Sequence, residues 1–366
     1  MRASFNAERF EKDHVLIACV ILLAGLGLVT LYSSSYAFAQ NRFISRQLVL
    51  CAVGIVLFCM ASVINLELLR KIIKPMVMFA FVLCILTFVP GIGLNINGAS
   101  RWIEIGGFSY QPSELVKLVL PLYLAHLFEK KKENIDSVIR GLIPPALITG
   151  AFFTVIFFQN NFSTAAFLAV NALFMFYFAG VKFRYLVCAV LMFVPISILM
   201  VLEKEHRVRR FLSYIQPGFE PQGASYQVIA SMDSISSGGF WGKGIGYGTR
   251  EPSSVPEIHS DFIFSSYAEE SGFLGVILFC LLFALFAIRG YMLSMSNEKT
   301  FNRLLGVGLV TMIISQVLLN IGVAAGALPA TGVPLPFFSA GGSSLVTTLM
   351  MSGLIVNVSR VLKRED

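Results

Sequence analysis

Long apolar runs separated by short polar segments follow one another along almost the whole chain. Each run holds about 17 to 25 residues, enough for a helix to cross the ~30 Å hydrocarbon core of a bilayer. The longest polar segment, at about 203–260, separates the seventh run from the eighth. The pattern predicts ten membrane-spanning helices, at roughly 14–36, 47–64, 73–90, 112–128, 142–159, 163–180, 184–202, 261–288, 304–325 and 341–359.

These spans predict an all-α integral membrane protein with one large extracellular loop between spans 7 and 8. No period of about 20 to 50 residues repeats and no low-complexity linker divides the chain, so residues 1–366 are interpreted as one domain. Composition agrees, because 56% of the 366 residues are hydrophobic and only 13% are charged. A soluble protein of this length needs more charge to cover its surface.

The basic residues indicate the orientation of the chain. Lys and Arg gather in alternate loops, and the short outer loops hold only Arg42, Arg46 and Arg101. The positive-inside rule then predicts that both termini are cytoplasmic and that the 203–260 loop is extracellular. The net charge of +7 is spread over loops rather than concentrated on one face, which argues against a nucleic-acid partner.

Charged residues at the start of span 4 are the first candidates for chemistry. Pro112 favours the first turn of a helix, Glu114 lies near the positive end of the helix dipole, and Lys117 follows on the same face. One interpretation is a self-neutralising Glu114–Lys117 pair that only eases insertion. The other is a polar wall beneath an outward cavity, where Lys117 and Arg101 of the preceding loop face an anionic substrate.

The long loop carries two further cationic stretches. The cluster at 203–210 includes Arg207 and Arg210, and it suits either lipid headgroups or a pyrophosphate held by bidentate arginine contacts. The glycine-rich stretch 236–249 lacks the Walker spacing, but its glycines permit tight turns and Lys243 supplies a charge.

The loop ends on Ser260 and Asp261, directly before the eighth apolar run. Ser and Asp here are typical of a helix N-cap, and an Asp at an outer membrane boundary is equally suited to act as a general base on a hydroxyl. Glu269 and Glu270 are expected about 12 to 14 Å deeper in the span. Because adjacent helix residues diverge by about 100°, at least one is expected to pair with a basic residue of a neighbouring span.

The segment 328–344 joins spans 9 and 10 and contains three prolines and three glycines in an apolar context. This composition predicts a non-helical, partly re-entrant segment. Such backbone is tolerated at membrane depth only when it is buried in protein or lines a water-filled cavity, so we expect it to face the same cavity as the long loop.

Four stretches together resemble one family. They are Ser100–Trp102, Gln111–Lys117, His259–Phe264 with Ala268–Glu270, and Pro334–Phe337 with Gly341–Ser344. In this order they are similar to the SEDS family, which includes the RodA, FtsW and SpoVE proteins, and the similarity covers nearly the whole chain. Three positions depart from the family pattern: Asn161 stands where an acid is common, Ser260 where Thr is commoner, and Ala340 where Tyr is commoner.

The resemblance implies a peptidoglycan glycosyltransferase, an inverting enzyme of the bacterial cytoplasmic (inner) membrane with its active site on the outer face. Its substrate would be lipid II, the undecaprenyl pyrophosphate-linked disaccharide peptide. Asp261 matches the family's essential aspartate and is the expected catalytic base. The candidate substrate-binding residues are Arg101, Glu114, Lys117, Arg207, Arg210, Lys243, Ser260 and Ser343, and Glu269 and Glu270 are expected to form a structural polar network.

The leaving pyrophosphate needs positive charge, which basic side chains or a divalent cation, Mg²⁺ or Mn²⁺, would supply. The resemblance also implies a class B penicillin-binding protein as transpeptidase partner in an elongation or division complex. Two other functions stay open. A lipid II flippase or other transporter would depend on Glu114, Lys117, Glu269 and Glu270 more than on Asp261, and a noncatalytic scaffold for a transpeptidase would not need Asp261.

Overall fold

The computed structural model describes residues 10–11, 13–36, 41–96, 98–106, 108–135, 137–216, 224–248 and 261–362, and these are predominantly helical. Each of the ten predicted spans overlaps one helix, and α1 (His14–Tyr36) has the same bounds as the first prediction. The other nine are α2 (Asn41–Val63), α3 (Leu66–Leu86), α4 (Pro112–Lys130), α5 (Ile143–Phe158), α6 (Phe162–Phe178), α7 (Phe183–Leu202), α10 (Ile263–Met295), α11 (Thr300–Ala324) and α12 (Gly342–Val358).

Six helical segments of the described chain are long and apolar enough to cross a membrane: α1, α2, α7, α10, α11 and the segment Val138–Phe158, which consists of a π-helical turn followed by α5, so the chain is a multi-pass membrane protein. The apolar helices α6 and α12 are shorter. The remaining two, α3 and α4, carry several charged side chains, including Arg70 on α3 and Lys117 on α4. A charged side chain at membrane depth is costly unless it has a partner inside the protein, so α3 and α4 depend on such partners to lie in a bilayer.

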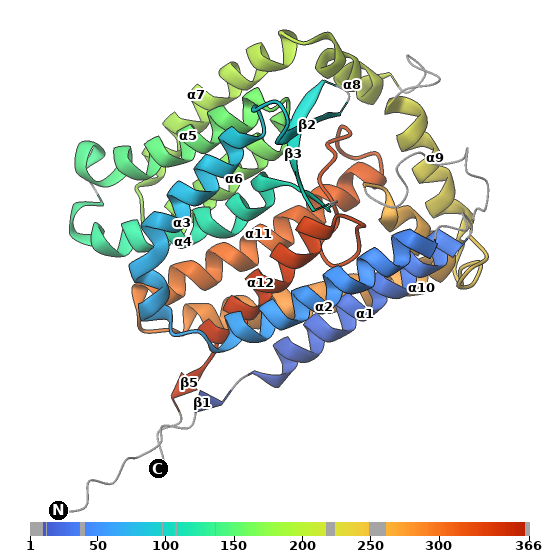
Figure 1. Ribbon diagram of the computed structural model, residues 1–366, viewed down its shortest axis with the longest axis horizontal. Coiled ribbons are helices and arrows are strands. Elements are labelled where there is room, and N and C mark those ends of the chain that lie inside the picture. Colours follow the sequence, from blue (N-terminus) through green and yellow to red (C-terminus); the bar gives the residue numbers. More distant parts are fainter. Residues whose placement is uncertain are drawn as a thin grey trace, which may run out of the picture.

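Two features show that the all-α prediction was incomplete. Residues 93–110 form a three-stranded antiparallel sheet of β2 (Gly93–Ile96), β3 (Ala99–Ile105) and β4 (Phe108–Tyr110). Near the two ends of the chain, β1 (Phe10–Glu11) pairs with β5 (Val361–Leu362). The long loop also contains two helices that were not predicted, α8 (Glu205–Ile215) and α9 (Ala224–Ser237). The sheet, α8 and α9 lie at one end of the long helices, and the β1–β5 pair lies at the other (Figure 1).

The core forms around α4, α11 and α12. α12 packs along α2, α11 contacts α4, α6 and α10, and α1 lies beside α10 (Figure 1). On α12, the Asn357 amide nitrogen donates to the carbonyl oxygens of Ala61 and Ile64 at 2.8 and 2.7 Å, which satisfies the end of α2. In contrast, α7 has no buried residue and contacts mainly α6 and α8. It is the most peripheral of the long helices that the structure describes.

The helix α10 is broken at Gly272, whose φ of 64° and ψ of −169° lie outside the helical region. The rings of Phe264 and Phe279 are 5.5 Å apart, and the Tyr267 hydroxyl donates to the carbonyl of Gly275 at 2.9 Å. In a continuous helix, Phe264 and Phe279 would be separated by about 22 Å. Residues 263–271 therefore fold back beside the rest of α10.

This reversal corrects the predicted depth of the two glutamates. Glu269 and Glu270 lie at the tip of the α10 hairpin, where the amides of Lys243 and Gly244 donate to their backbone carbonyls at 3.0 Å each. Asp261, at the other end of the short arm, lies beside Asn320 of α11. The expectation that the glutamates lie deeper than Asp261 was wrong, because it assumed an unbroken helix.

The connection between α11 and α12 is non-helical and buried, as predicted. Val333, Leu335 and Phe337 are each at most 2% exposed. A side chain on Gly27 of α1 would overlap the carbonyl of Phe337, so the segment reaches the middle of α1. We call residues 325–341 the re-entrant segment. It forms one wall of the site described next.

Candidate functional site

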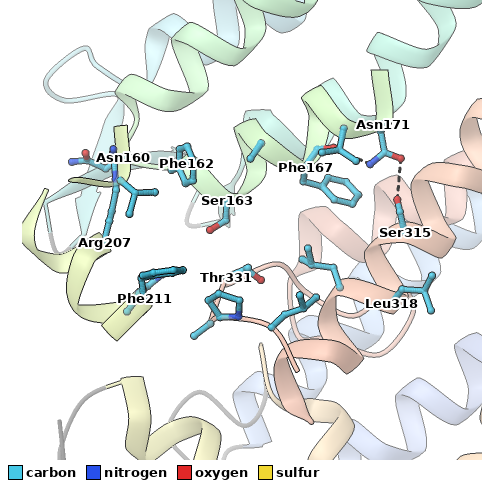
Figure 2. Close-up of a pocket in the computed structure, with 18 of the residues that line it drawn as sticks. Asn160, Phe162, Ser163, Phe167, Asn171, Arg207, Phe211, Ser315, Leu318 and Thr331 are labelled. Atoms are coloured by element: carbon cyan, nitrogen blue, oxygen red, sulfur yellow. Dashed lines mark hydrogen bonds between the residues drawn. The ribbon is translucent and has the colours of Figure 1, made fainter. Parts of the chain in front are cut away.

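A cavity of about 510 Å³ lies between α6, α8, α11 and the start of the re-entrant segment (Figure 2). One end is polar and includes Arg101, Arg207 and Arg210. The other end is an apolar groove between α6 and α11. We call this the α6–α11 cavity; its apolar lining includes Phe162, Ala166, Phe167, Val170, Leu318 and Leu319.

The three arginines reach the cavity from different elements. Arg101 lies on β3, and its guanidinium donates to the carbonyl oxygen of Asn160 in the α5–α6 turn. Arg207 and Arg210 lie on α8. The guanidinium carbon of Arg207 lies 4.6 Å from the ring centre of Phe157, and one of its nitrogens donates to the Met200 carbonyl at 2.8 Å. These contacts fix the charge at the mouth of the cavity.

The polar end is short of negative charge. Burial and, to a lesser extent, the positive charges of Arg210 and Arg207 together lower the pKa of Arg101 to about 10, while the negative charge of Asp261 acts in the opposite direction. Burial also lowers the pKa of Arg207. Both side chains remain cationic at neutral pH. An anion bound between them would relieve their repulsion, and arginine suits phosphate oxygens because its planar fork binds two of them.

Asp261 adjoins this polar end. It lines a small neighbouring cavity of about 20 Å³ together with Arg210 and Thr331. The Asn320 amide nitrogen donates at 2.9 Å to the carbonyl oxygens of both Asp261 and Val333, and so ties Asp261 to the re-entrant segment. A Cβ atom on Gly332 would come within 3.3 Å of the Asp261 carboxylate, so glycine at this position avoids a close contact with that carboxylate.

The helix-cap alternative for Asp261 is not observed. The N-cap residue of α10 is Phe262, and no side chain caps the helix. Ser260, the other candidate in this motif, lies outside the described residues. The N-cap of α10 therefore gives no account of the position of Asp261.

Glu114 and Lys117 form a buried pair behind the lining of the α6–α11 cavity, with Lys117 Nζ 5.7 Å from the ring centre of Phe167. Lys117 Nζ lies 2.7 Å from Glu114 Oε1, with the side chains 1% and 3% exposed. Lys117 also donates to Gln316 Oε1 at 3.2 Å, and Gln316 Nε2 donates to the Pro334 carbonyl at 2.7 Å. This chain of contacts connects α4 to α11 and the re-entrant segment. The geometry fits the self-neutralising interpretation, and the proposed substrate role of the pair stays a prediction.

Lys243 is likewise engaged by the protein. Its ammonium lies 2.5 Å from Glu269 Oε1, which also accepts from Ser237 at 3.3 Å. Glu270 accepts instead from Ser33 of α1 at 2.5 Å. The two glutamates do face different partners, and Glu269 pairs with a basic residue as expected. That residue belongs to the long loop and not to a neighbouring span.

Ser343 lies apart from the arginines, at the start of α12. Its hydroxyl accepts the backbone N–H of Gln111 at 3.1 Å, and both residues line a second cavity of about 470 Å³. This second cavity lies between α2, the β3–β4 hairpin and the start of α12, and we call it the α2 cavity.

Sequence reasoning missed the residues that hold the re-entrant segment. Gln316 and Asn320 are four apart on α11, hence on one face, and both are at most 1% exposed. Polar amides inside an apolar helix rarely lack a partner. Two amide side chains four residues apart in an apolar helix were the sequence feature that could have identified these residues.

A divalent cation would find few protein ligands here. Asp261 is the sole carboxylate among the described residues that line the α6–α11 cavity and its small neighbour. Within the described part of the chain, no group of three or more His, Cys, Asp or Glu is placed to hold a metal ion. A cation bound near Asp261 would therefore take most of its oxygen ligands from substrate phosphates and water.

Comparison with known proteins places these features in context. Residues 13–364 match the family FTSW_RODA_SPOVE, described as cell cycle protein. A relative from Geobacter sp. (strain M18), named probable peptidoglycan glycosyltransferase FtsW, is 34% identical, with 95% of this chain and 96% of the relative covered. Stage V sporulation protein E of Bacillus subtilis is also 34% identical, with 97% and 99% covered.

Two solved structures share the fold. A chain from a peptidoglycan synthase complex that coordinates polymerization and crosslinking matches with a TM-score of 0.81 and 28% identity, covering 97% of this chain and 99% of that one. The rod shape determining protein RodA of Thermus thermophilus matches with a TM-score of 0.71 and 26% identity, covering 99% of both chains.

Proposed function

Because this chain belongs to the FtsW/RodA/SpoVE family, the SEDS proteins, we propose that it is a peptidoglycan glycosyltransferase that polymerises lipid II. The observation that carries the proposal is the juxtaposition of an arginine cluster, an apolar groove and the Asp261 carboxylate. A lipid-linked pyrophosphate saccharide has an anionic centre, an apolar tail and a reacting sugar. The site offers a matching surface to each.

The α6–α11 cavity is the proposed donor site. Arg101, Arg207 and Arg210 would hold the pyrophosphate, whose negative charge grows as the glycosidic bond breaks. The polyprenyl tail would follow the apolar groove along Phe167 and Leu318 toward the lipid (Figure 2). Fixing the charged groups before reaction is what makes such electrostatic stabilisation effective.

Asp261 is the proposed general base. Its carboxylate would accept the proton of the acceptor's GlcNAc 4-hydroxyl while that oxygen forms a bond to the anomeric carbon of the donor. The bond from that carbon to the pyrophosphate oxygen breaks with inversion, and undecaprenyl pyrophosphate leaves. General-base catalysis typically contributes about 10²–10⁴-fold. When bound, Mg²⁺ or Mn²⁺ would add positive charge at the leaving group.

The membrane arrangement is proposed as well. Ten spans, a cytoplasmic location for both termini and an outer location for the active site agree with the distribution of Lys and Arg. The pairing of β1 with β5, near the two ends of the chain, supports a location of both termini on one side. A class B penicillin-binding protein, in an elongation or division complex, is the proposed partner. The similar chain in a complex that coordinates polymerization and crosslinking supports it.

The test is polymerisation of purified lipid II by the protein together with its transpeptidase, comparing wild type with Asp261→Asn. We expect glycan strands from wild type and a loss of about 10²–10⁴-fold in the variant. Asp233→Asn, which changes an acid on α9 outside the described cavities, is the matched control. Equal product from wild type and Asp261→Asn would remove Asp261 from the chemistry. No product from either would favour a flippase or a scaffold.

A further inference from the structure

A further cavity adjoins the proposed donor site and has no part in the reaction as described so far. It has a volume of about 150 Å³ and lies between α8, α9 and the start of the re-entrant segment, and we call it the α8–α9 pocket. Arg210 and Ala330 line this pocket, the α6–α11 cavity and the small cavity beside Asp261. The three spaces therefore adjoin one another at these two residues.

The walls of the pocket are held by hydrogen bonds to the backbone of α11 and of the re-entrant segment. The Tyr214 hydroxyl, near the end of α8, donates to the Ala327 carbonyl at 3.0 Å. The Ser231 hydroxyl of α9 donates to the Ala324 carbonyl at 2.9 Å. These contacts form the pocket without a ligand, and a pocket formed in advance lowers the cost of binding.

One polar side chain inside the pocket lacks a partner. Ser213 is 5% exposed, and its Oγ makes no hydrogen bond to any residue that the structure describes. The hydroxyl of Ser225, in contrast, donates to the Ser213 carbonyl at 3.5 Å. A buried hydroxyl without a partner is costly, so Ser213 Oγ points to a ligand that would hydrogen-bond to it. Most of the remaining lining is apolar and includes Val228, Ile229 and Leu328, which suits a small apolar group with one hydrogen-bonding atom.

Size and position indicate which part of the substrate this group would be. Pockets for whole small-molecule ligands have volumes of about 300–1,000 Å³, so about 150 Å³ suits one substituent and not a saccharide. Arg210 would hold the pyrophosphate, and the anomeric carbon would lie near Asp261. In a lipid-linked N-acetyl amino sugar, the acetamido group is bonded to the carbon next to the anomeric carbon. A pocket at Arg210 would receive this substituent, with its methyl among the apolar side chains and its carbonyl oxygen at Ser213.

We propose that the α8–α9 pocket binds the acetamido group of the donor sugar, with the Ser213 hydroxyl donating to the acyl oxygen, and so makes the enzyme specific for an N-acetylated donor. The proposal rests on the proposed polymerase function and adds a specificity-determining residue to the donor site. Ser213 binds and orients the donor sugar and takes no proton from it. Holding the acetamido group fixes the rotation of the sugar ring on its pyrophosphate, and thereby the face of the anomeric carbon that meets the acceptor hydroxyl.

The test is a competition between donor analogues, because a ratio of products does not depend on the amount of folded protein. Each labelled analogue is a lipid II whose terminal sugar lacks the 4-hydroxyl, so it acts as a donor and not as an acceptor, and unlabelled lipid II is the acceptor. Two analogues, with N-acetyl or the larger N-butyryl on the sugar next to the pyrophosphate, are mixed in equal amounts. Ile229→Ala enlarges the pocket and should raise the incorporation ratio of N-butyryl to N-acetyl about tenfold, since added methylenes in an apolar pocket change specificity by this amount. Ile235→Ala, the same substitution on α9 at a residue that does not line the pocket, should leave the ratio unchanged.

A second pair of variants tests the hydrogen bond. Ser213→Ala should lower incorporation of the N-acetyl analogue about three- to tenfold relative to an analogue with a hydroxyl in place of the acetamido group, because it removes one hydrogen bond to the acyl oxygen. Ser236 is exposed on α9, and Ser236→Ala should keep the wild-type ratio. Wild-type ratios in both Ile229→Ala and Ser213→Ala would overturn the acetamido site and leave the polymerase intact. Failure of wild type to make glycan from lipid II would overturn the proposed function itself.

Discussion

The buried pair of Glu114 and Lys117 yields the sharpest stability prediction. At 2.7 Å and 1–3% exposure, the two charges are removed from solvent together. Their attraction at an effective dielectric constant of 20 is roughly 6 kcal/mol, most of which is offset by the cost of desolvating both groups. Lys117→Met leaves the Glu114 carboxylate buried without its counter-charge and Gln316 Oε1 without its donor. Loss of one partner of such a pair typically destabilises a protein by about 3–5 kcal/mol.

The double variant Glu114→Gln with Lys117→Met removes both charges and should recover most of this loss, because neutral replacements of a buried pair are often well tolerated. The free energy of unfolding is measured in mixed micelles for the wild type, both single variants and the double variant. A double-mutant cycle then isolates the coupling between the two side chains. Glycan polymerisation is measured on the same four proteins.

The two interpretations of this pair predict opposite results. If the pair is structural, stability and polymerisation fall together in the single variants and recover together in the double variant. If Lys117 instead binds the pyrophosphate, Lys117→Met loses activity at wild-type stability and the double variant stays inactive. Additive effects on unfolding, with no coupling between the side chains, would refute the argument from burial.

Three further predictions concern α8, α10 and the long loop. Arg207→Ala should lower kcat/KM for lipid II by about 10- to 100-fold, because it removes a charge-assisted contact. Arg209 is exposed on α8, and Arg209→Ala should leave kcat/KM unchanged. Equal effects of the two substitutions would contradict the donor site. Gly272→Ala should lower the thermal unfolding midpoint, because φ at this residue is 64° and a side chain would overlap the backbone of Gly242. A side chain on Gly150 of α5 would meet no atom, so Gly150→Ala should leave the midpoint unchanged. Lys243→Ala should speed limited proteolysis within 238–248, because it releases Glu269, and an unchanged cleavage rate would show that the ion pair does not hold this segment.

The sequence was sufficient to place the helices because hydrophobic length is a local property. The bounds of α1 were predicted to the residue, and the non-helical character of the re-entrant segment followed from its prolines and glycines. The break at Gly272 was missed, although α10 has 33 residues and about 20 suffice to cross a bilayer. A helix so much longer than the bilayer requires was the sequence feature that could have indicated a break.

The site depends on long-range contacts, which a single sequence does not reveal. The sequence identified Arg101, Arg207 and Asp261 as candidates from their residue types and positions. It could not show that β3 and α8 bring Arg101 and Arg207 to one cavity, with Asp261 in a small cavity beside it. It also could not distinguish a charge held by the protein from a charge offered to a ligand. Lys117 and Lys243, both candidates for phosphate binding, are paired with Glu114 and Glu269.

The close approach of Phe337 to Gly27 has a consequence for how the protein is made. The re-entrant segment is synthesised long after α1, yet the backbone carbonyl of its residue Phe337 lies against Gly27 of α1. Before the segment reaches this contact, α1 does not shield its polar backbone from lipid. The helices made earlier must therefore leave space beside Gly27 until the re-entrant segment has been synthesised. Substituting Gly27 with a larger residue should trap the newly made chain at that stage, where quality-control proteases of the membrane would remove it.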